Sequence, residues 1–323
     1  MTMAIRIHET GGPEKLIYEP VEIGAPGPGQ ALVRQTAVGF NFIDIYHRKG
    51  IYPMPMPATL GTEGAGVIEA LGKGVKGLKV GDRVAYAGGP PGAYAQARII
   101  AADLLVPLPK AIDDKSAAAM MLKGMTAEYL LRRTYKVKKG DTILVHSAAG
   151  GVGLILCQWA KHLGATVIGT VSTDEKAAEA KKHGCKYPIV VPREDFQKRV
   201  MEITKGKGVP VVYDGVGKDT FDQSMACLAP FGIMALFGQS SGVVPPINPA
   251  ILAKACTYLT RPTLFIYNSN REALLKSANA LFSVVKSGAV KIRVNHTYPL
   301  AETARAHEDV AARKTTGSVV LIA

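Results

Sequence analysis

The sequence predicts an α/β protein in which a doubly wound parallel sheet is joined to a smaller, mostly antiparallel β domain. Residues 1 to about 120 hold short β-like runs punctuated by Gly and Pro, a spacing typical of a compact β domain. From about residue 115, apolar strands alternate with longer helical stretches. This second pattern indicates repeated βα units around a parallel sheet.

The β-rich part contains strand-like runs at 31–38, 66–71 and 82–86, separated by Pro- and Gly-rich turns at 26–29 and 53–57. A helical period then covers 116–133, with Ser116 as its expected N-cap because a hydroxyl accepts hydrogen bonds at a helix start. This helix marks the change to the second pattern.

The βα series continues with buried strands and intervening helices, and the tail repeats the alternation. Expected strands are 142–146, 166–171, 187–191, 209–214 and 232–237; expected helices are 152–163 and 174–182. In the tail we expect helices at 271–287 and 301–313 and strands near 291–294 and at 318–322. We expect the tail to fold back onto the first domain.

Bulk composition excludes several classes of protein. The chain has 323 residues, 47% of them apolar, and no apolar stretch approaches the 18 residues of a membrane span. The first residues lack the apolar segment of a signal peptide, so we expect a cytoplasmic protein. The four cysteines are far apart and form no C-x-x-C pair, which favours buried free thiols over disulfides or a Cys-based zinc site.

The net charge of +13 is spread over the chain rather than concentrated in one run. A basic protein attracts nucleic acid, an anionic surface or an anionic ligand. The densest runs of Lys and Arg fall on expected helix surfaces, where solvated faces explain them. A phosphate-rich cofactor would also benefit from this field.

Residues 143–153 carry the clearest motif, a dinucleotide-binding fingerprint with Ala148, Gly150 and Gly153 in its small-residue places. Small residues allow a tight turn, a close backbone approach to a pyrophosphate, and close packing of helix on sheet. The helix starting near Gly151 would present free N–H groups to the phosphates. The motif follows a strand and opens a helix, which is the context it requires.

The end of the second strand, 169–173, lacks the acid that usually binds the ribose hydroxyls of NAD. Ser172 and Lys176 follow instead, and a hydroxyl and an ammonium suit a 2′-phosphate. Asp174 and Glu175 are explained as acids of a first helical turn. We therefore expect NADPH rather than NADH.

Residues 60–72 and 80–84 resemble the medium-chain dehydrogenase/reductase superfamily. Zinc-dependent members have Gly-His-Glu where this chain has Gly61, Thr62 and Glu63. Their upstream Cys ligand, in the region here numbered 39–46, and their four-Cys lobe near 90–110 are also missing. No two of the seven His are at ligand spacing. No catalytic zinc is expected.

A closer resemblance, over essentially the whole chain, is to the zinc-free quinone oxidoreductase branch that includes zeta-crystallin. The matching pieces are 8–13, 41–46, 61–64, 122–126, 148–153, 158–161, 212–217 and 260–262. The resemblance implies a GroES-like domain at 1–122, completed by a return segment at 265–323, and a Rossmann domain at 123–264. It also implies NADPH-dependent reduction of a quinone and a homodimer.

The resemblance implies the following site. Asn41 and Tyr46 would lie where the nicotinamide meets the acceptor, with Tyr52 across the cleft. One departure concerns 191–193, where relatives often have a Tyr near the adenine and where Arg193 could supply the contact. With the residues already named, the implied cofactor-binding set is Phe42, Ile43, Asp44, Lys123, Thr126, Tyr129, Ala148, Gly150, Gly151, Val152, Gly153, Ser172, Thr173, Lys176, Arg193, Val216, Phe237, Gly238, Gln239, Ser240, Ser241, Pro262, Leu264 and Arg313.

A quinone is already electrophilic, so its reduction is mainly a positioning problem that needs no Lewis acid. Tyr46 and Tyr52 could stack on the ring or donate to a carbonyl, or they could be plain core aromatics. Asn41 could donate to the acceptor or cap a turn.

Two further side chains have open alternatives. Asp44 could be a site acid or pair with Arg48 four residues on. Lys123 could donate a proton or be a solvated helix lysine.

Two other functions compete with quinone reduction. The same scaffold could reduce the double bond of an enone or 2-alkenal. The chain could also bind NADPH or RNA without turnover, which its charge permits although no aromatic–basic recognition motif supports RNA binding.

Overall fold

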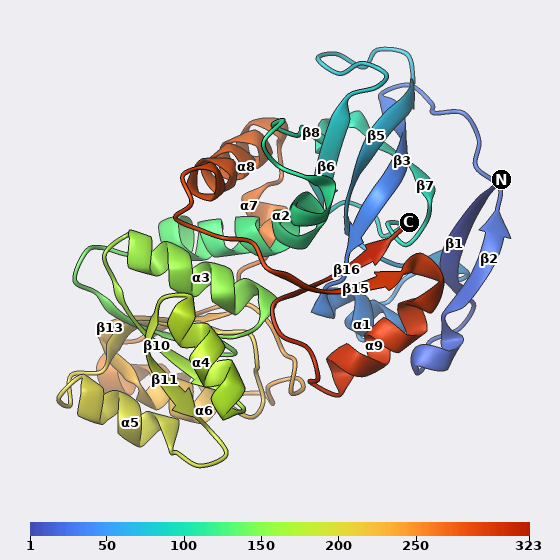
Figure 1. The fold of residues 1–323 in the computed structure, drawn as a ribbon. Coiled ribbons are helices and arrows are strands. Elements are labelled where there is room, and N and C mark those ends of the chain that lie inside the picture. Colours follow the sequence, from blue (N-terminus) through green and yellow to red (C-terminus); the bar gives the residue numbers. More distant parts are fainter. The chain divides into compact units, whose positions relative to one another are not determined.

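The computed structural model describes all 323 residues, and the chain divides into two compact units (Figure 1). The first unit comprises Met1–Met125, Asn268–Lys286 and Ile292–Ala323, and the second comprises Thr126–Tyr267 and Ser287–Lys291. Most of the tail after Tyr267 thus belongs to the first unit, whereas Ser287–Lys291 packs with the second. The predicted fold class, a parallel α/β sheet plus a mostly β domain, is confirmed.

The first unit is built on a seven-stranded sheet and a three-stranded sheet. The larger runs in the order β15 (Val294–Pro299), β16 (Ser318–Ile322), β3 (Gln30–Gly39), β5 (Glu63–Leu71), β6 (Arg83–Ala87) and β8 (Val106–Pro107), and β7 (Ala97–Ala101) also pairs with β3. The smaller consists of β2 (Ile17–Val21), β1 (Thr2–Ile7) and β4 (Ala58–Thr59). The last strand of the chain, β16, pairs antiparallel with β3, which fixes the C-terminus in this unit.

Four helices accompany these sheets: α1 (Phe42–Arg48), α2 (Asp114–Tyr129, which continues into the second unit), α8 (Arg271–Lys286) and α9 (Thr303–Ala311). Helix α1 follows β3 directly, so its first residues lie at the end of the strand at the centre of the larger sheet. Apolar residues alternate along β3 and face the core of this unit, together with Ile5, Ile68 and Val84.

The second unit contains a six-stranded parallel sheet with strand order β11-β10-β9-β12-β13-β14. The order grows outward in both directions from β9, which makes the sheet doubly wound. Its strands are β9 (Thr142–Val145), β10 (Thr166–Val171), β11 (Cys185–Val190), β12 (Val209–Asp214), β13 (Leu228–Leu236) and β14 (Tyr258–Thr260). The helices are α3 (Gly151–His162), α4 (Asp174–Lys182), α5 (Phe196–Ile203), α6 (Phe221–Ala226) and α7 (Leu264–Tyr267).

Several sequence expectations are wrong in detail. Ser116 is not the N-cap of α2: it lies inside the helix, and the carboxylate of Asp113 accepts its N–H at 2.9 Å and its hydroxyl at 2.7 Å. An anion satisfies the first N–H groups better than a hydroxyl because it also complements the helix dipole. The helix then ends at Tyr129 and passes into a single π-turn at Leu130–Thr134, rather than continuing regularly to residue 133.

The tail differs from expectation in similar ways. The strand expected at 291–294 begins only at Val294, because the Lys291 N–H is bound to the Gln158 side chain at 2.9 Å. Helix α9 ends at Ala311, and Arg313 follows it with a positive φ of 58°. Three cysteines are buried as expected, but Cys256 is exposed. None of the helices combines the length and apolar character needed to cross a bilayer.

The core of the second unit gives a test of the packing. Trp159 on α3 is 2% exposed, whereas Val243 in a loop is 60% exposed. We expect Trp159→Ala to lower the free energy of unfolding by about 3–5 kcal/mol, because it leaves a large cavity. Val243→Ala should change it by less than about 0.5 kcal/mol. Urea unfolding followed by circular dichroism measures both, and equal losses would contradict this packing.

Candidate functional site

The turn after β9 is shaped to expose backbone N–H groups. Ser147 adopts a positive φ of 52°, and the Ala148 N–H is bound to the Thr170 carbonyl at 2.9 Å. A Cβ on Gly153 would lie 2.2 Å from the Ser147 carbonyl oxygen, so only glycine fits there. Gly150 caps α3, whose first N–H groups have no carbonyl within the helix to bind. The fingerprint therefore forms a turn whose geometry suits an anion.

Most of the residues predicted to bind cofactor in the second unit, including the fingerprint, follow strands at one edge of its sheet. Parallel strands end at the same edge, and the switch point between β9 and β12 is where such sheets bind ligands. The predicted residues follow the carboxyl ends of all six strands: Ala148, Gly150, Gly151, Val152 and Gly153 after β9; Ser172, Thr173 and Lys176 after β10; Arg193 after β11; Val216 after β12; Phe237, Gly238, Gln239, Ser240 and Ser241 after β13; Pro262 and Leu264 after β14.

The end of β10 leads into α4 through a capped first turn that carries both acids and a cation. Thr173 caps α4 by accepting the Lys176 N–H at 3.3 Å. Arg193 binds the carboxylate of Asp174 through two nitrogens, at 2.8 and 2.7 Å. This pairing neutralises Asp174, while Glu175 stays next to Lys176 in the first turn of α4. It also holds Arg193, which remains largely exposed, beside the predicted adenine end.

Asp214, for which the sequence suggested no role, organises the loop after β12. This carboxylate is fully buried and accepts the N–H groups of Val216 at 2.7 Å and Gly217 at 3.0 Å. The hydroxyl and N–H of Ser241 both bind the Val216 carbonyl, at 2.8 and 2.9 Å. The two loops after β12 and β13 are thus fixed to each other. The sequence signal for this role was a single acid at the end of an expected strand, followed directly by Gly-x-Gly.

Two predicted residues of helix α2, Thr126 and Tyr129, are buried in the second unit. The Tyr129 ring stacks on Tyr267, with centroids 4.5 Å apart and an interplanar angle of 7°. Arg133 lies over the other ring of this pair, 4.9 Å from the Tyr267 centroid. The stack anchors the π-turn that ends α2.

In the first unit, the predicted catalytic residues lie on or next to α1. Asn41 is the N-cap of α1, and its N–H is bound to Asp44 at 2.9 Å. Tyr46 is nearly buried, and its ring meets Phe42 at 5.7 Å and Tyr52 at 5.4 Å, both edge to face. The Tyr52 ring therefore packs directly against the Tyr46 ring.

Glu63, which was quoted in a motif but given no role, joins three segments of the first unit. Its carboxylate is fully buried. One oxygen accepts the Leu122 N–H at 2.7 Å, and the other accepts the Asn41 amide at 2.7 Å and the Lys123 ammonium at 3.1 Å. Lys123 is therefore buried in an ion pair, so the solvated alternative is wrong. The Asn41 amide is occupied, which agrees with the capping alternative.

Asp44 is the most perturbed acid of this unit. Burial raises its pKa to about 7, although the Asn41 N–H and the Tyr94 hydroxyl, 2.9 Å away, favour the ionised form. The alternative pairing with Arg48 is not formed. Arg48 instead donates to the Gly11 carbonyl at 3.2 Å and contacts His307 at 2.9 Å. Burial, followed by the charge of Arg48, lowers the pKa of His307 well below its usual range.

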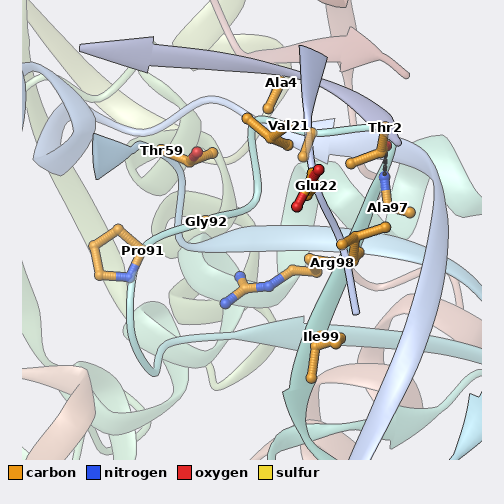
Figure 2. A pocket seen from close by; sticks show the side chains of 12 residues that line it. Thr2, Ala4, Val21, Glu22, Thr59, Pro91, Gly92, Ala97, Arg98 and Ile99 are labelled. Atoms are coloured by element: carbon orange, nitrogen blue, oxygen red, sulfur yellow. Dashed lines mark hydrogen bonds between the residues drawn. The ribbon is translucent and has the colours of Figure 1, made fainter. Parts of the chain in front are cut away.

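A pocket of about 170 Å³ also lies in the first unit, beside the small sheet (Figure 2). Thr2, Glu22, Thr59 and Arg98 contribute its polar lining. None of the residues predicted for catalysis or cofactor binding lines it. No group of three or more His, Cys, Asp or Glu side chains is arranged to hold a metal ion.

Comparison with known proteins gives consistent matches over the whole chain. Residues 27–110 match the alcohol dehydrogenase GroES-like domain, and residues 151–273 match the zinc-binding dehydrogenase family. A Pseudomonas aeruginosa quinone oxidoreductase is 51% identical over 100% of both chains, and a Burkholderia 2-haloacrylate reductase is 48% identical over 100% of this chain and 99% of its own. The solved structure of Escherichia coli quinone oxidoreductase complexed with NADPH has a TM-score of 0.98 and 47% identity, covering 99% of this chain and 100% of that one.

The raised pKa of Asp44 predicts a pH-dependent stability. The folded protein keeps this proton to about pH 7, whereas the unfolded chain loses it near pH 4. The contribution of Asp44 to the free energy of unfolding is therefore full below about pH 4 and is lost as the pH rises towards 7. On going from about pH 5 to pH 8, the free energy of unfolding of Asp44→Asn should rise relative to that of the native chain. We expect this relative change to be on the order of 1 kcal/mol or more. Urea unfolding at both pH values measures this.

The matched control for that experiment is the exposed acid Asp222. Asp222→Asn should show nearly the same pH dependence as the native chain. A stability difference between Asp44→Asn and the native chain that stays constant with pH would contradict the raised pKa.

Proposed function

Because this chain belongs to the quinone oxidoreductase family of the medium-chain dehydrogenases and reductases, we propose that it oxidises NADPH and reduces a quinone. The observation that carries the proposal is the anion-binding turn at Ala148–Gly153, at the switch point of a parallel sheet. Quinone oxidoreductases that are about half identical over their full length support the acceptor class.

The residues of the second unit fit NADPH. The free N–H groups at the start of α3 would bind its diphosphate, and Ser172 and Lys176 would bind its 2′-phosphate. The loops held together by Asp214 and Ser241 would line the nicotinamide ribose. Bound NADPH would supply the reducing equivalents; the protein binds, orients and excludes water.

The first unit offers a wall of rings for a flat acceptor. Phe42, Tyr46 and Tyr52 meet edge to face, and Phe42 is 37% exposed. Such an arrangement leaves aromatic surface on which a quinone ring can pack. We assign acceptor contact to Tyr46 and Tyr52, and the N-terminal positioning of α1 to Asn41. The family likeness alone suggests that Arg313 approaches the cofactor.

A second candidate is reduction of an activated carbon–carbon double bond. It is favoured by the 2-haloacrylate reductase that is 48% identical over the whole chain. Both reactions present the reduced cofactor with a conjugated carbonyl compound. Reduction of a quinone and reduction of a carbon–carbon double bond differ in which atom of the acceptor receives the electron pair.

We also infer a homodimer in the cytoplasm. Both inferences rest on the family likeness. Light scattering at several protein concentrations would test the homodimer, because a mass of one 34.2 kDa chain at every concentration contradicts it.

Oxidation of NADPH by the purified protein tests the proposed function. Phenanthrenequinone and benzoquinone represent quinones, methyl vinyl ketone represents enones, and 2-chloroacrylate represents haloacrylates. We expect the highest kcat/KM with a quinone. Faster turnover of either alkene substrate would favour the second candidate, and no NADPH oxidation with any acceptor would refute both.

Coenzyme preference should depend on Lys176. Lys176→Met removes a cation from the proposed 2′-phosphate site, so we expect the Kd for NADPH to rise roughly 10- to 100-fold. The Kd for NADH should hardly change, because NADH lacks this phosphate. Fluorescence titration measures both. Lys181→Met, an exposed change on the same helix, is the control, and an equal effect of Lys176→Met on NADH would contradict the assignment.

A further inference from the structure

Glu63 and Lys123 form a buried ion pair in the first unit. The Glu63 side chain is 0% exposed and that of Lys123 is 8% exposed. Removing two charges from water is costly. A buried ion pair therefore often stabilises a protein no more than a well-packed apolar pair would at the same place. Burial at this cost suggests that the charges serve a purpose besides stability.

The ammonium of Lys123 keeps donors available. An ammonium carries three N–H donors, and the hydrogen bond of this one is to Glu63 at 3.1 Å. Glu63 itself is fully engaged, since it also accepts the Leu122 N–H and the Asn41 amide. Glu63 therefore fixes the position of the ammonium without using all of its donors.

The ammonium also lies next to the start of α1. Lys123 Nζ and Asn41 Nδ2 both bind the same oxygen of Glu63, at 3.1 and 2.7 Å. Asn41 is the N-cap of the helix that carries Phe42 and Tyr46. The positive charge is thus held beside Asn41, the residue that precedes the helix carrying Phe42 and Tyr46.

Three of the other polar side chains nearby have their hydrogens engaged within the protein. The Tyr94 hydroxyl donates to Asp44, the Tyr86 hydroxyl donates to Gln35, and the Asn41 amide donates to Glu63. Asp44 itself receives two hydrogen bonds on one oxygen. Lys123 is the cationic donor bound to Glu63.

Reduction of a quinone creates a need for such a donor. When a hydride and its electron pair add to a quinone, the product is a hydroquinone monoanion with a charged oxygen. A preorganised cation stabilises developing charge strongly where water is excluded. The same cation can then transfer a proton.

We propose that Lys123 is a catalytic residue that binds the developing oxyanion of the acceptor and protonates it, while Glu63 acts as a positioning residue for its ammonium. This inference rests on the proposed function, which supplies NADPH as the reductant. An N–H bond of Lys123 breaks and an O–H bond forms on the acceptor, while the electron pair stays on nitrogen. The quinone is reduced to hydroquinone, NADPH is oxidised to NADP⁺, and the neutral amine recovers a proton from water.

Lys123→Met tests the assignment, because methionine keeps most of the side-chain length and loses the charge. We expect kcat with phenanthrenequinone to fall roughly 100-fold, while the Kd for NADPH changes less than about threefold. Lys115→Met, an exposed change on the same helix, should leave kcat unchanged. A folded Lys123→Met protein with the native kcat would overturn the proposal.

A readout other than turnover uses 4-nitrophenol, whose ionised form absorbs visible light and imitates the hydroquinone monoanion. On the native protein we expect bound nitrophenol to ionise at a lower pH than free nitrophenol, and this shift should disappear in Lys123→Met. The native measurement stands even if the variant does not fold. Nitrophenol that binds and ionises only at a higher pH than in water would overturn the proposal.

These results separate the two proposals. If the native protein reduces no quinone yet lowers the ionisation pH of nitrophenol, the proposed function fails and the anion site at Lys123 remains. If it reduces quinones and Lys123→Met does so equally well, the assignment of Lys123 fails and the proposed function remains.

Discussion

The carboxylate of Glu63 is the constraint on which the proposed acceptor side of this protein depends. It is fully buried and satisfied by three donors from the start of α1 and from α2. A buried carboxylate that lost these donors would be strongly destabilising. The segments are therefore held in one arrangement, and Asn41 and Lys123 take their positions from it.

Local pattern was sufficient for most of the fold. The strands at 142–145, 166–171 and 209–214 were predicted almost to the residue, because continuous apolar runs between helical stretches are typical of buried parallel strands. The errors in the predicted secondary structure were mainly at the ends of helices. Ser116 and Asp113 are both acceptable caps in sequence, and only the backbone geometry decides between them.

The cofactor side was more predictable than the acceptor side for a physical reason. A phosphate-binding turn is made by consecutive residues, so Gly150 and Gly153 reveal it directly. The polar cluster of the first unit joins residues distant in sequence: Glu63 binds a residue 22 positions earlier and one 59 positions later, and Tyr94 contacts His307, 213 positions away. No local spacing predicts such partners, so the sequence offered Arg48, four residues on, as one alternative partner for Asp44.

The single tryptophan makes this chain its own optical probe. Trp159 lies about two turns after Gly151 on α3 and is almost fully shielded from solvent. All indole emission therefore comes from one buried site on α3, the helix that begins at the fingerprint turn. Changes in that emission on adding a dinucleotide would report on the surroundings of this one indole, without any label attached to the protein.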